Sequence, residues 1–338
     1  PLLTQPTNPS TFGGSLWAQT KDFKLGTIQQ FNLNVQRQLP GDILFTVGYA
    51  GSRSTHLLTS GFNLNSPTPQ GRGKAALPPP YPQYGNITGI LDNGFSRYDS
   101  LQVKAETKNT RHGLYALVGY TYARTWDTSL VDNLSGGLGV TYYPLPFEPN
   151  EDKGFAPIQL NHDFTGSVVY DLPFGKGKQF GSNWGGATNA ALGDWEVNII
   201  EHITSGFPLA MSTTNNSGAV FVNNSNRPNR VCNGRLSNWT VAQFFDPGCF
   251  VDPPPGTLGN ATRTPLFGPS FVNTDLSAIK NIRIGESVSL QFRAEVFNLF
   301  NTPQFAQPGT FVDAPNFGQI TATVNNPRLI QFALKLIF

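Results

Sequence analysis

Charge is scarce in this sequence. Asp, Glu, Lys and Arg together make up 13% of its 338 residues, about half of the ~25% that is usual in globular domains. Their place is taken by Asn, Gln, Ser and Thr, and the mean hydropathy of −0.23 shows no surplus of apolar residues. The 23 Lys and Arg residues nearly balance the 21 Asp and Glu residues, and no basic stripe with interleaved aromatics occurs. The composition gives no electrostatic support for nucleic-acid binding and suits strands with one apolar face and one uncharged polar face.

Long hydrophobic runs and an export signal are missing as well. Nowhere do 18 apolar residues follow one another, so no transmembrane helix is predicted. The chain begins Pro1-Leu2-Leu3-Thr4, with neither an initiator Met nor a charged start followed by an apolar run, so no signal peptide is visible. An exported protein is made with such a segment, so a chain of that class would have its true N-terminus upstream of Pro1.

Catalytic motifs are also missing. The sequence has no G-x-S-x-G, no H-E-x-x-H and no P-loop. The glycine-rich segment 174–181 follows Leu172-Pro173 without phosphate-loop spacing and predicts a turn. The four histidines are scattered, and we interpret His162 beside Asp163 as a hydrogen-bonded pair at the start of a strand. We therefore expect no enzyme and no cofactor.

Cysteine is limited to Cys232 and Cys249, which lie in a polar stretch rich in Pro and Gly. In an exported protein these two residues would form one loop disulfide; two unpaired thiols are the alternative. No His or third Cys lies nearby at ligand spacing, so a metal site is not expected.

Alternation of apolar and polar residues is the dominant pattern that is present. It is clearest over residues 328–338, and it recurs over 288–296, 30–39, 101–108 and 163–172. The apolar face of the C-terminal segment comprises Ile330, Phe332, Leu334, Leu336 and Phe338.

Nine strands are predicted from this pattern and its interruptions. Short and long connections alternate between them, as in outer-membrane barrels, which have short periplasmic turns and long external loops. Amphipathic strands in lipid must also close into a barrel, because only closure pairs every backbone group. The predicted strands span residues 26–39, 42–57, 97–108, 113–125, 161–172, 189–205, 273–284, 287–300 and 326–338.

The predicted fold class is therefore all-β: a transmembrane antiparallel β-barrel with long extracellular loops. Single-chain bacterial barrels usually have an even number of strands, so we expect further strands upstream of residue 1. Two charged residues, Glu201 and Lys280, fall on or near the predicted lipid face, where a charge is costly. Either both lie near a membrane interface or the register near 189–205 and 273–284 is wrong.

Several segments resemble one family. The most specific is 290–301, which reads LQFRAEVFNLFN; others are 256–260, 268–281 and the run that begins at Asn161-His162-Asp163-Phe164. Together they resemble the C-terminal barrel of Oar-like TonB-dependent transporters, which are common in acidobacteria. The resemblance covers about residues 26–338, and it leaves residues 1–25 as the end of a preceding loop.

The resemblance implies a larger protein. Members of this family have a 22-stranded barrel, of which about nine strands would lie here, and an N-terminal plug. A TonB complex of the inner membrane supplies energy through an N-terminal region that would lie upstream of Pro1. The C-terminal residues Phe332, Leu334, Leu336 and Phe338 resemble the signal that the barrel-assembly machinery reads; an ordinary strand ending in Phe is the alternative.

Two sets of residues are candidates for contact with a ligand. Aromatic residues among Asn and Pro suit sugars or peptides but equally suit a loop that packs on itself, and these are Trp239, Phe244, Phe245 and Phe250. Charged residues on the polar face of two predicted strands would line a substrate path, contact a plug or pair with one another across a wet wall, and these are Lys104, Glu106, Arg293 and Glu295.

The function predicted is that of a monomeric outer-membrane barrel which takes up a large nutrient of the siderophore, oligosaccharide or peptide class. Its expected partners are outer-membrane lipid, the barrel-assembly machinery and the TonB complex. A passive porin or an adhesion-type barrel is one alternative. A secreted all-β carbohydrate-binding surface protein is another, and it would be soluble in plain buffer.

Overall fold

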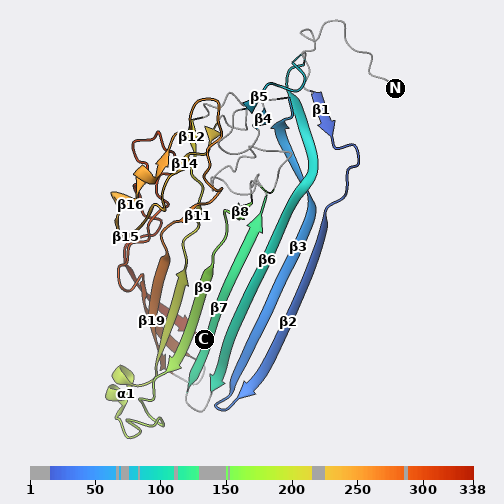
Figure 1. The fold of residues 1–338 in the computed structure, drawn as a ribbon. Helices are drawn as coiled ribbons and strands as arrows, with labels where there is room; N and C mark the ends of the chain where they lie inside the picture. The colour runs from blue at the N-terminus through green and yellow to red at the C-terminus, as the bar shows by residue number, and fades with distance from the viewer. Residues whose placement is uncertain are drawn as a thin grey trace.

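The computed structural model describes residues 16–65, 68–69, 76–82, 84–109, 113–128, 150, 153–214, 225–284 and 288–338. Within these residues nine long strands form one curved, open antiparallel sheet in which neighbours in sequence are neighbours in space (Figure 1). The all-β antiparallel prediction is confirmed. The strands are β2 (Thr27–Leu39), β3 (Ile43–Asn63), β6 (Ile87–Asn109), β7 (Leu114–Asp127), β9 (His162–Asp171), β10 (Trp195–Thr204), β19 (Phe271–Arg283), β20 (Ser289–Phe297) and β21 (Leu329–Ile337).

Shorter elements lie at the two ends of the sheet (Figure 1). The only α-helix among the described residues, α1 (Gly186–Leu192), lies at the end with the short turns, and none of the described helices is long and apolar enough to cross a membrane. The remaining short strands and one 3-10 helix are β1 (Leu16–Gln19), β4 (Thr68–Pro69), β5 (Ala76–Leu77), β8 (Gly154–Phe155), β11 (Pro208–Leu209), β12 (Thr213–Thr214), β13 (Ser225–Asn226), β14 (Asn229–Arg230), β15 (Arg235–Thr240), β16 (Gln243–Phe245), η4 (Pro247–Cys249), β17 (Phe250–Val251) and β18 (Leu266–Phe267). β1 pairs in parallel with β6, and β8 pairs with β7.

Register keeps one face of the sheet apolar and the other polar. Successive side chains of a strand point to opposite faces, so directly paired residues form rows on one face. One row is apolar across seven strands: Val35, Val47, Val103, Tyr120, Phe164, Ile203 and Val272. The row on the other face, one residue along, is polar or small: Gln36, Thr46, Lys104, Gly119, Thr165, His202 and Asn273.

Three predicted strand boundaries are wrong. β3 extends to Asn63, past the predicted end at residue 57, and β6 begins at Ile87, before the predicted start at residue 97. The segment 189–194 is not part of the strand predicted to begin at residue 189, because Asn189 to Leu192 belong to α1 and β10 begins at Trp195. Ala and Leu are among the strongest helix formers, and the apolar residues of Asn189-Ala190-Ala191-Leu192 do not separate helix from strand by periodicity. The predicted turn Gly285-Glu286 lies outside the described residues.

The two charged residues on the apolar face are accommodated without a change of register. Lys280 is opposite Trp195, at the first residue of β10 and hence near the turn end of the sheet. Its buried ammonium donates hydrogen bonds to the carbonyls of Asn189, at 3.2 Å, and Gly193, at the C-terminal end of α1, where a cation is favourable. Glu201 accepts a hydrogen bond of 2.5 Å from the Thr274 hydroxyl.

Candidate functional site: the external loops and the polar wall

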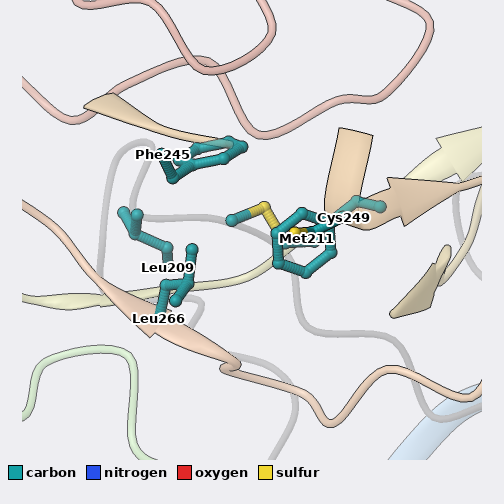
Figure 2. Close-up of a cluster of buried hydrophobic side chains, with 6 residues drawn as sticks. Leu209, Met211, Phe245, Cys249 and Leu266 are labelled. Atoms are coloured by element: carbon teal, nitrogen blue, oxygen red, sulfur yellow. The ribbon is translucent and has the colours of Figure 1, made fainter. Parts of the chain in front are cut away.

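The long loop between β10 and β19, residues 205–270, has a hydrophobic core of its own. Figure 2 shows part of this loop core, which consists of Leu209, Met211, Phe245, Cys249, Phe250 and Leu266. Phe317, from the segment between β20 and β21, packs against the loop core and brings its ring centroid to 5.1 Å from that of Phe245. The backbone amide of Phe244 also donates to the carbonyl of Gly318 at 2.7 Å. The two long connections, which the sequence presents as separate loops, therefore fold together.

A disulfide joins Cys232 to Cys249 in this loop, with a Cα–Cα distance of 4.8 Å. Its buried end, Cys249, belongs to the loop core. Asp246 lies with the two sulfur atoms in the sole group of three possible metal ligands that the described residues contain. Because thiolates are the form in which cysteine binds metal, the disulfide removes two of these three ligands.

Two of the four aromatic residues predicted to contact a ligand are buried instead. Phe245 and Phe250 are 1% and 2% exposed, and they pack against each other with ring centroids 5.7 Å apart. For these two residues the alternative, a loop that packs on itself, is what the structure has, since neither ring reaches solvent. Sequence did not separate them from their neighbours because all four lie in one stretch without regular periodicity.

Of the other two aromatic residues, Trp239 is exposed and Phe244 is half-buried, with one side against the loop core. Trp239 is 38% exposed and makes an edge contact with the ring of Phe244, at 4.9 Å between centroids. Phe305, from the segment between β20 and β21, also makes an edge contact with Trp239, at 5.8 Å between centroids. We call Trp239, Phe244 and Phe305 the aromatic surface. Phe305 was not predicted, because nothing local in its sequence indicates that it folds against Trp239, 66 positions earlier in the chain.

Asp313 holds the two loops together by hydrogen bonds. Its carboxylate accepts bonds from the amide and the hydroxyl of Thr214, at 3.0 and 2.6 Å. These bonds lower the pKa of Asp313 below its ordinary value, the hydroxyl bond contributing most. The neighbouring Thr213 hydroxyl donates to Asp252.

This contact should be sensitive to acid. A carboxyl group whose pKa is lowered by folding stabilises the folded loop above its unfolded pKa, ~3.9 for Asp, and the contribution is lost as pH falls through the folded pKa. We expect protection of the Thr214 amide from hydrogen exchange, corrected for intrinsic rates, to fall with a midpoint below that value. Asp313→Asn should abolish the midpoint. Asp246→Asn, a change in the loop that contains Thr214, should preserve it. An unchanged midpoint in Asp313→Asn would show that another group controls the contact.

A buried ion pair attaches the long loop to the sheet. The Arg263 side chain is 1% exposed; its guanidinium pairs with Asp127, at the end of β7, and donates to the carbonyls of Gly154 and Phe155 at 2.9 and 3.0 Å. Beside it the ring of Phe155 lies between those of Trp126 and Phe267, at 4.3 and 5.1 Å. This attachment is not predictable from sequence, since the two charges are 136 positions apart and no local pattern connects them.

The four charged candidates of the polar face fall into two separate places. Lys104 and Glu106 of β6 form an ion pair of 2.9 Å. On β20, Arg293 donates to Gln291 at 2.7 Å, and Glu295 accepts from Gln331 of β21 at 2.6 Å. β7, β9, β10 and β19 separate β6 from β20, so the four residues form no single site in the described sheet.

The predicted pairing of His162 with Asp163 is wrong. Neighbouring residues of a strand face opposite sides, so His162 lies on the apolar face, 2.8 Å from the Tyr120 hydroxyl. Asp163 lies on the polar face, 3.4 Å from the Nε2 atom of His202.

The C-terminal strand presents its predicted residues on one exposed face. Phe332, Leu334, Leu336 and Phe338 are all exposed, and the Phe332 ring stacks on Phe292 of β20 at 6.2 Å. A strand in contact with lipid requires apolar side chains such as these on its outward face.

The chain belongs to a known family. The family described as "Outer membrane beta barrel domain" matches residues 1–331, and the protein is accordingly an outer-membrane β-barrel protein of bacteria. No curated protein matches the sequence.

The chain is similar to several solved structures of transporters and receptors. They include the outer membrane transporter YddB from Escherichia coli, with a TM-score of 0.50 at 9% identity over 96% of this chain and 34% of that one. The FrpB iron transporter from Neisseria meningitidis has a TM-score of 0.43 at 10% identity, over 96% and 32%. The ferric-catecholate import receptor Fiu from E. coli K12 has a TM-score of 0.44 at 12% identity, over 98% and 31%. The chain thus spans about a third of the length of these structures. The likeness to YddB shows its fold alone.

Proposed function

We propose that this chain is the C-terminal part of the barrel of a TonB-dependent transporter of the Oar-like type, with residues 26–338 forming barrel and residues 1–25 the end of a preceding loop. The observation that carries the proposal is the combination of an apolar outer face with a folded external loop that exposes the aromatic surface. The likeness to the YddB fold and the resemblance of segment 290–301 to the Oar-like family support it.

In this proposal the chain carries no chemistry of its own. The polar wall, with Lys104, Glu106, Arg293 and Glu295, lines the passage, and the external loops capture the ligand. The TonB complex acts through a region upstream of Pro1. The ligand is a large nutrient of the siderophore, oligosaccharide or peptide class, because an aromatic surface among polar groups binds such molecules through ring faces and hydrogen bonds.

The test compares growth of the native bacterium on single nutrient sources with and without this protein, and with and without a functional TonB complex. A transporter of this type gives a nutrient whose uptake needs both. Uptake that needs the protein but not the TonB complex would identify a passive porin. Recovery of the full-length protein in plain buffer, without detergent, would contradict the membrane assignment itself.

Trp239→Ala should lower uptake of that nutrient at low concentration by about tenfold, the effect of removing one exposed aromatic anchor from a binding surface. Trp184→Ala is the matched control, since Trp184 lies between β9 and α1, at the turn end of the sheet. Equal uptake by the two variants would remove the aromatic surface from ligand capture.

A further inference from the structure

Three arginine residues gather on the apolar face of adjacent strands. Arg53 of β3 is directly opposite Arg97 of β6, and Asp99 of β6 is directly opposite Arg124 of β7. These positions share a face with the apolar row described above, because each is an even number of residues from Val47, Val103 or Tyr120 in its strand. We call Arg53, Arg97 and Arg124 the arginine cluster.

One carboxylate serves this cluster. Asp99 binds Arg53 and Arg97, each at 2.7 Å, and also accepts a bond of 2.6 Å from the Tyr49 hydroxyl. Like charges directly opposite each other in a sheet repel, so Asp99 explains how Arg53 and Arg97 coexist. Counting three guanidinium groups and one carboxylate, the cluster keeps a formal charge of +2.

The three arginine side chains differ in how many contacts they make within the protein. The guanidinium of Arg53 also donates to the carbonyls of Ser52 and Tyr98 and lies over the ring of Phe31, so it is held by the protein. The Arg97 side chain is 58% exposed. Arg124 is exposed and lies over the ring of Tyr122 at 5.5 Å; among the described residues it has no ion-pair partner. Arg97 and Arg124 therefore supply most of the accessible charge.

The cluster lies at one boundary of the apolar band. The next row on this face, toward the short turns, consists of Tyr49, Leu101, Tyr122 and His162. Aromatic residues such as Tyr49 and Tyr122 mark the membrane interface in barrels. From Leu114 to Tyr122 the strand rises about 27 Å, or about 20 Å along the membrane normal at the usual tilt. Arg124 is the next residue on this face, so it lies at the level of lipid headgroups.

The boundary is the external one. The short turn from Leu39 to Ile43 lies at the other end of β3, and the long connections lie beyond Arg53, Arg97 and Arg124 (Figure 1). Long connections are external in outer-membrane barrels. The headgroups at this level are consequently those of the outer leaflet, which is built of a phosphorylated glycolipid.

We propose that the arginine cluster binds phosphate groups of the outer-leaflet glycolipid. The planar guanidinium group matches phosphate with two parallel hydrogen bonds, and the excess positive charge lies where lipid phosphate lies. The aromatic row beneath packs on the acyl chains. A lipid held there is a fixed part of the barrel's outer surface and occupies no part of the polar wall or the aromatic surface.

The test measures lipid retained by the full-length protein in phosphatidylcholine nanodiscs containing bis-phosphorylated lipid A, by mass spectrometry after purification. Arg97→Gln or Arg124→Gln should lower retention about fivefold and the double variant about 25-fold, the contribution usual for basic side chains at an anionic surface. Arg37→Gln is the matched control: Arg37 lies on the same face near the periplasmic turn and should retain lipid A like the native protein.

Three results would overturn the proposal. These are equal retention by the double variant and Arg37→Gln, equal retention of lipid A whose phosphates have been removed, and full displacement by millimolar inorganic phosphate, which would indicate a site for the free anion. Arg97→Lys in the background of native Arg124 should restore most of the retention, because charge is kept. Heat-dependent gel mobility verifies that each variant is folded before its lipid content is compared.

Discussion

Val118→Arg is expected to destabilise the folded barrel by about 2–4 kcal/mol, the cost of an arginine on the lipid face near the bilayer midplane. Val118 is the middle residue of the apolar span from Leu114 to Tyr122, and its direct neighbours are Ala105 and Gly166. These small neighbours give the new side chain space but no partner, so the cost is that of the charge. The unfolding midpoint in urea, followed by heat-dependent gel mobility in lipid vesicles, measures it.

Thr121→Arg is the matched control for this prediction. Thr121 belongs to the same strand but faces the polar side, where it is opposite Gln102 and Asp163, so the added arginine gains a hydrogen-bond acceptor and a carboxylate. Its midpoint should stay close to that of the native protein. The reverse order of the two midpoints would mean that the polar side faces lipid, and the assignment of the two faces would be wrong.

Arg263→Met should release the long loop from the sheet. Removing one partner of a buried ion pair costs about 3–5 kcal/mol because the other charge stays buried, and here it also leaves the carbonyls of Gly154 and Phe155 without a donor. The loop core is elsewhere, so the loss should be local. In the native protein the Phe155 amide donates to the Thr264 hydroxyl at 3.1 Å. In the variant, hydrogen exchange at this amide should accelerate about 100-fold or more, while exchange in β2 and β3 should remain unchanged.

Two further variants identify the cause. Arg235→Met removes an exposed arginine from the same loop and should change nothing. The double variant Asp127→Asn/Arg263→Met removes the stranded charge and should recover part of the protection, since replacing both partners is less costly than removing one. If Arg263→Met exchanges as slowly as Arg235→Met, the ion pair does not attach the loop.

The strands could be predicted because the physics that places them is local. A two-residue period is visible in any short segment, and it placed β20 and β21 to within a few residues. The same signal was ambiguous at Asn189 to Leu192, where short apolar residues fit a helix as well as a strand. The alternation also placed Lys280 on the correct face of the sheet. Only the structure shows that its ammonium group binds carbonyls at the C-terminal end of α1.

The candidate site was less accessible from sequence because its contacts join distant residues. The loop core brings Leu209 to Phe250 and Phe317, and each looks like an ordinary loop residue in its own segment. Composition alone cannot separate Phe245, which is buried, from its neighbour Phe244, which reaches the surface. The Asp127–Arg263 pair and the arginine cluster depend on strand register, which becomes known only when strands are paired.

A loop with a hydrophobic core of its own has a consequence for how the sequence of such a protein can evolve. The six residues of the loop core hold the loop in shape, and the aromatic surface lies outside that set. Trp239, which is exposed and not part of the loop core, can therefore be exchanged without weakening either the loop or the membrane-spanning strands. In the proposed transporter, new recognition can arise by substitution at Trp239 while the membrane-spanning strands stay under unchanged constraint.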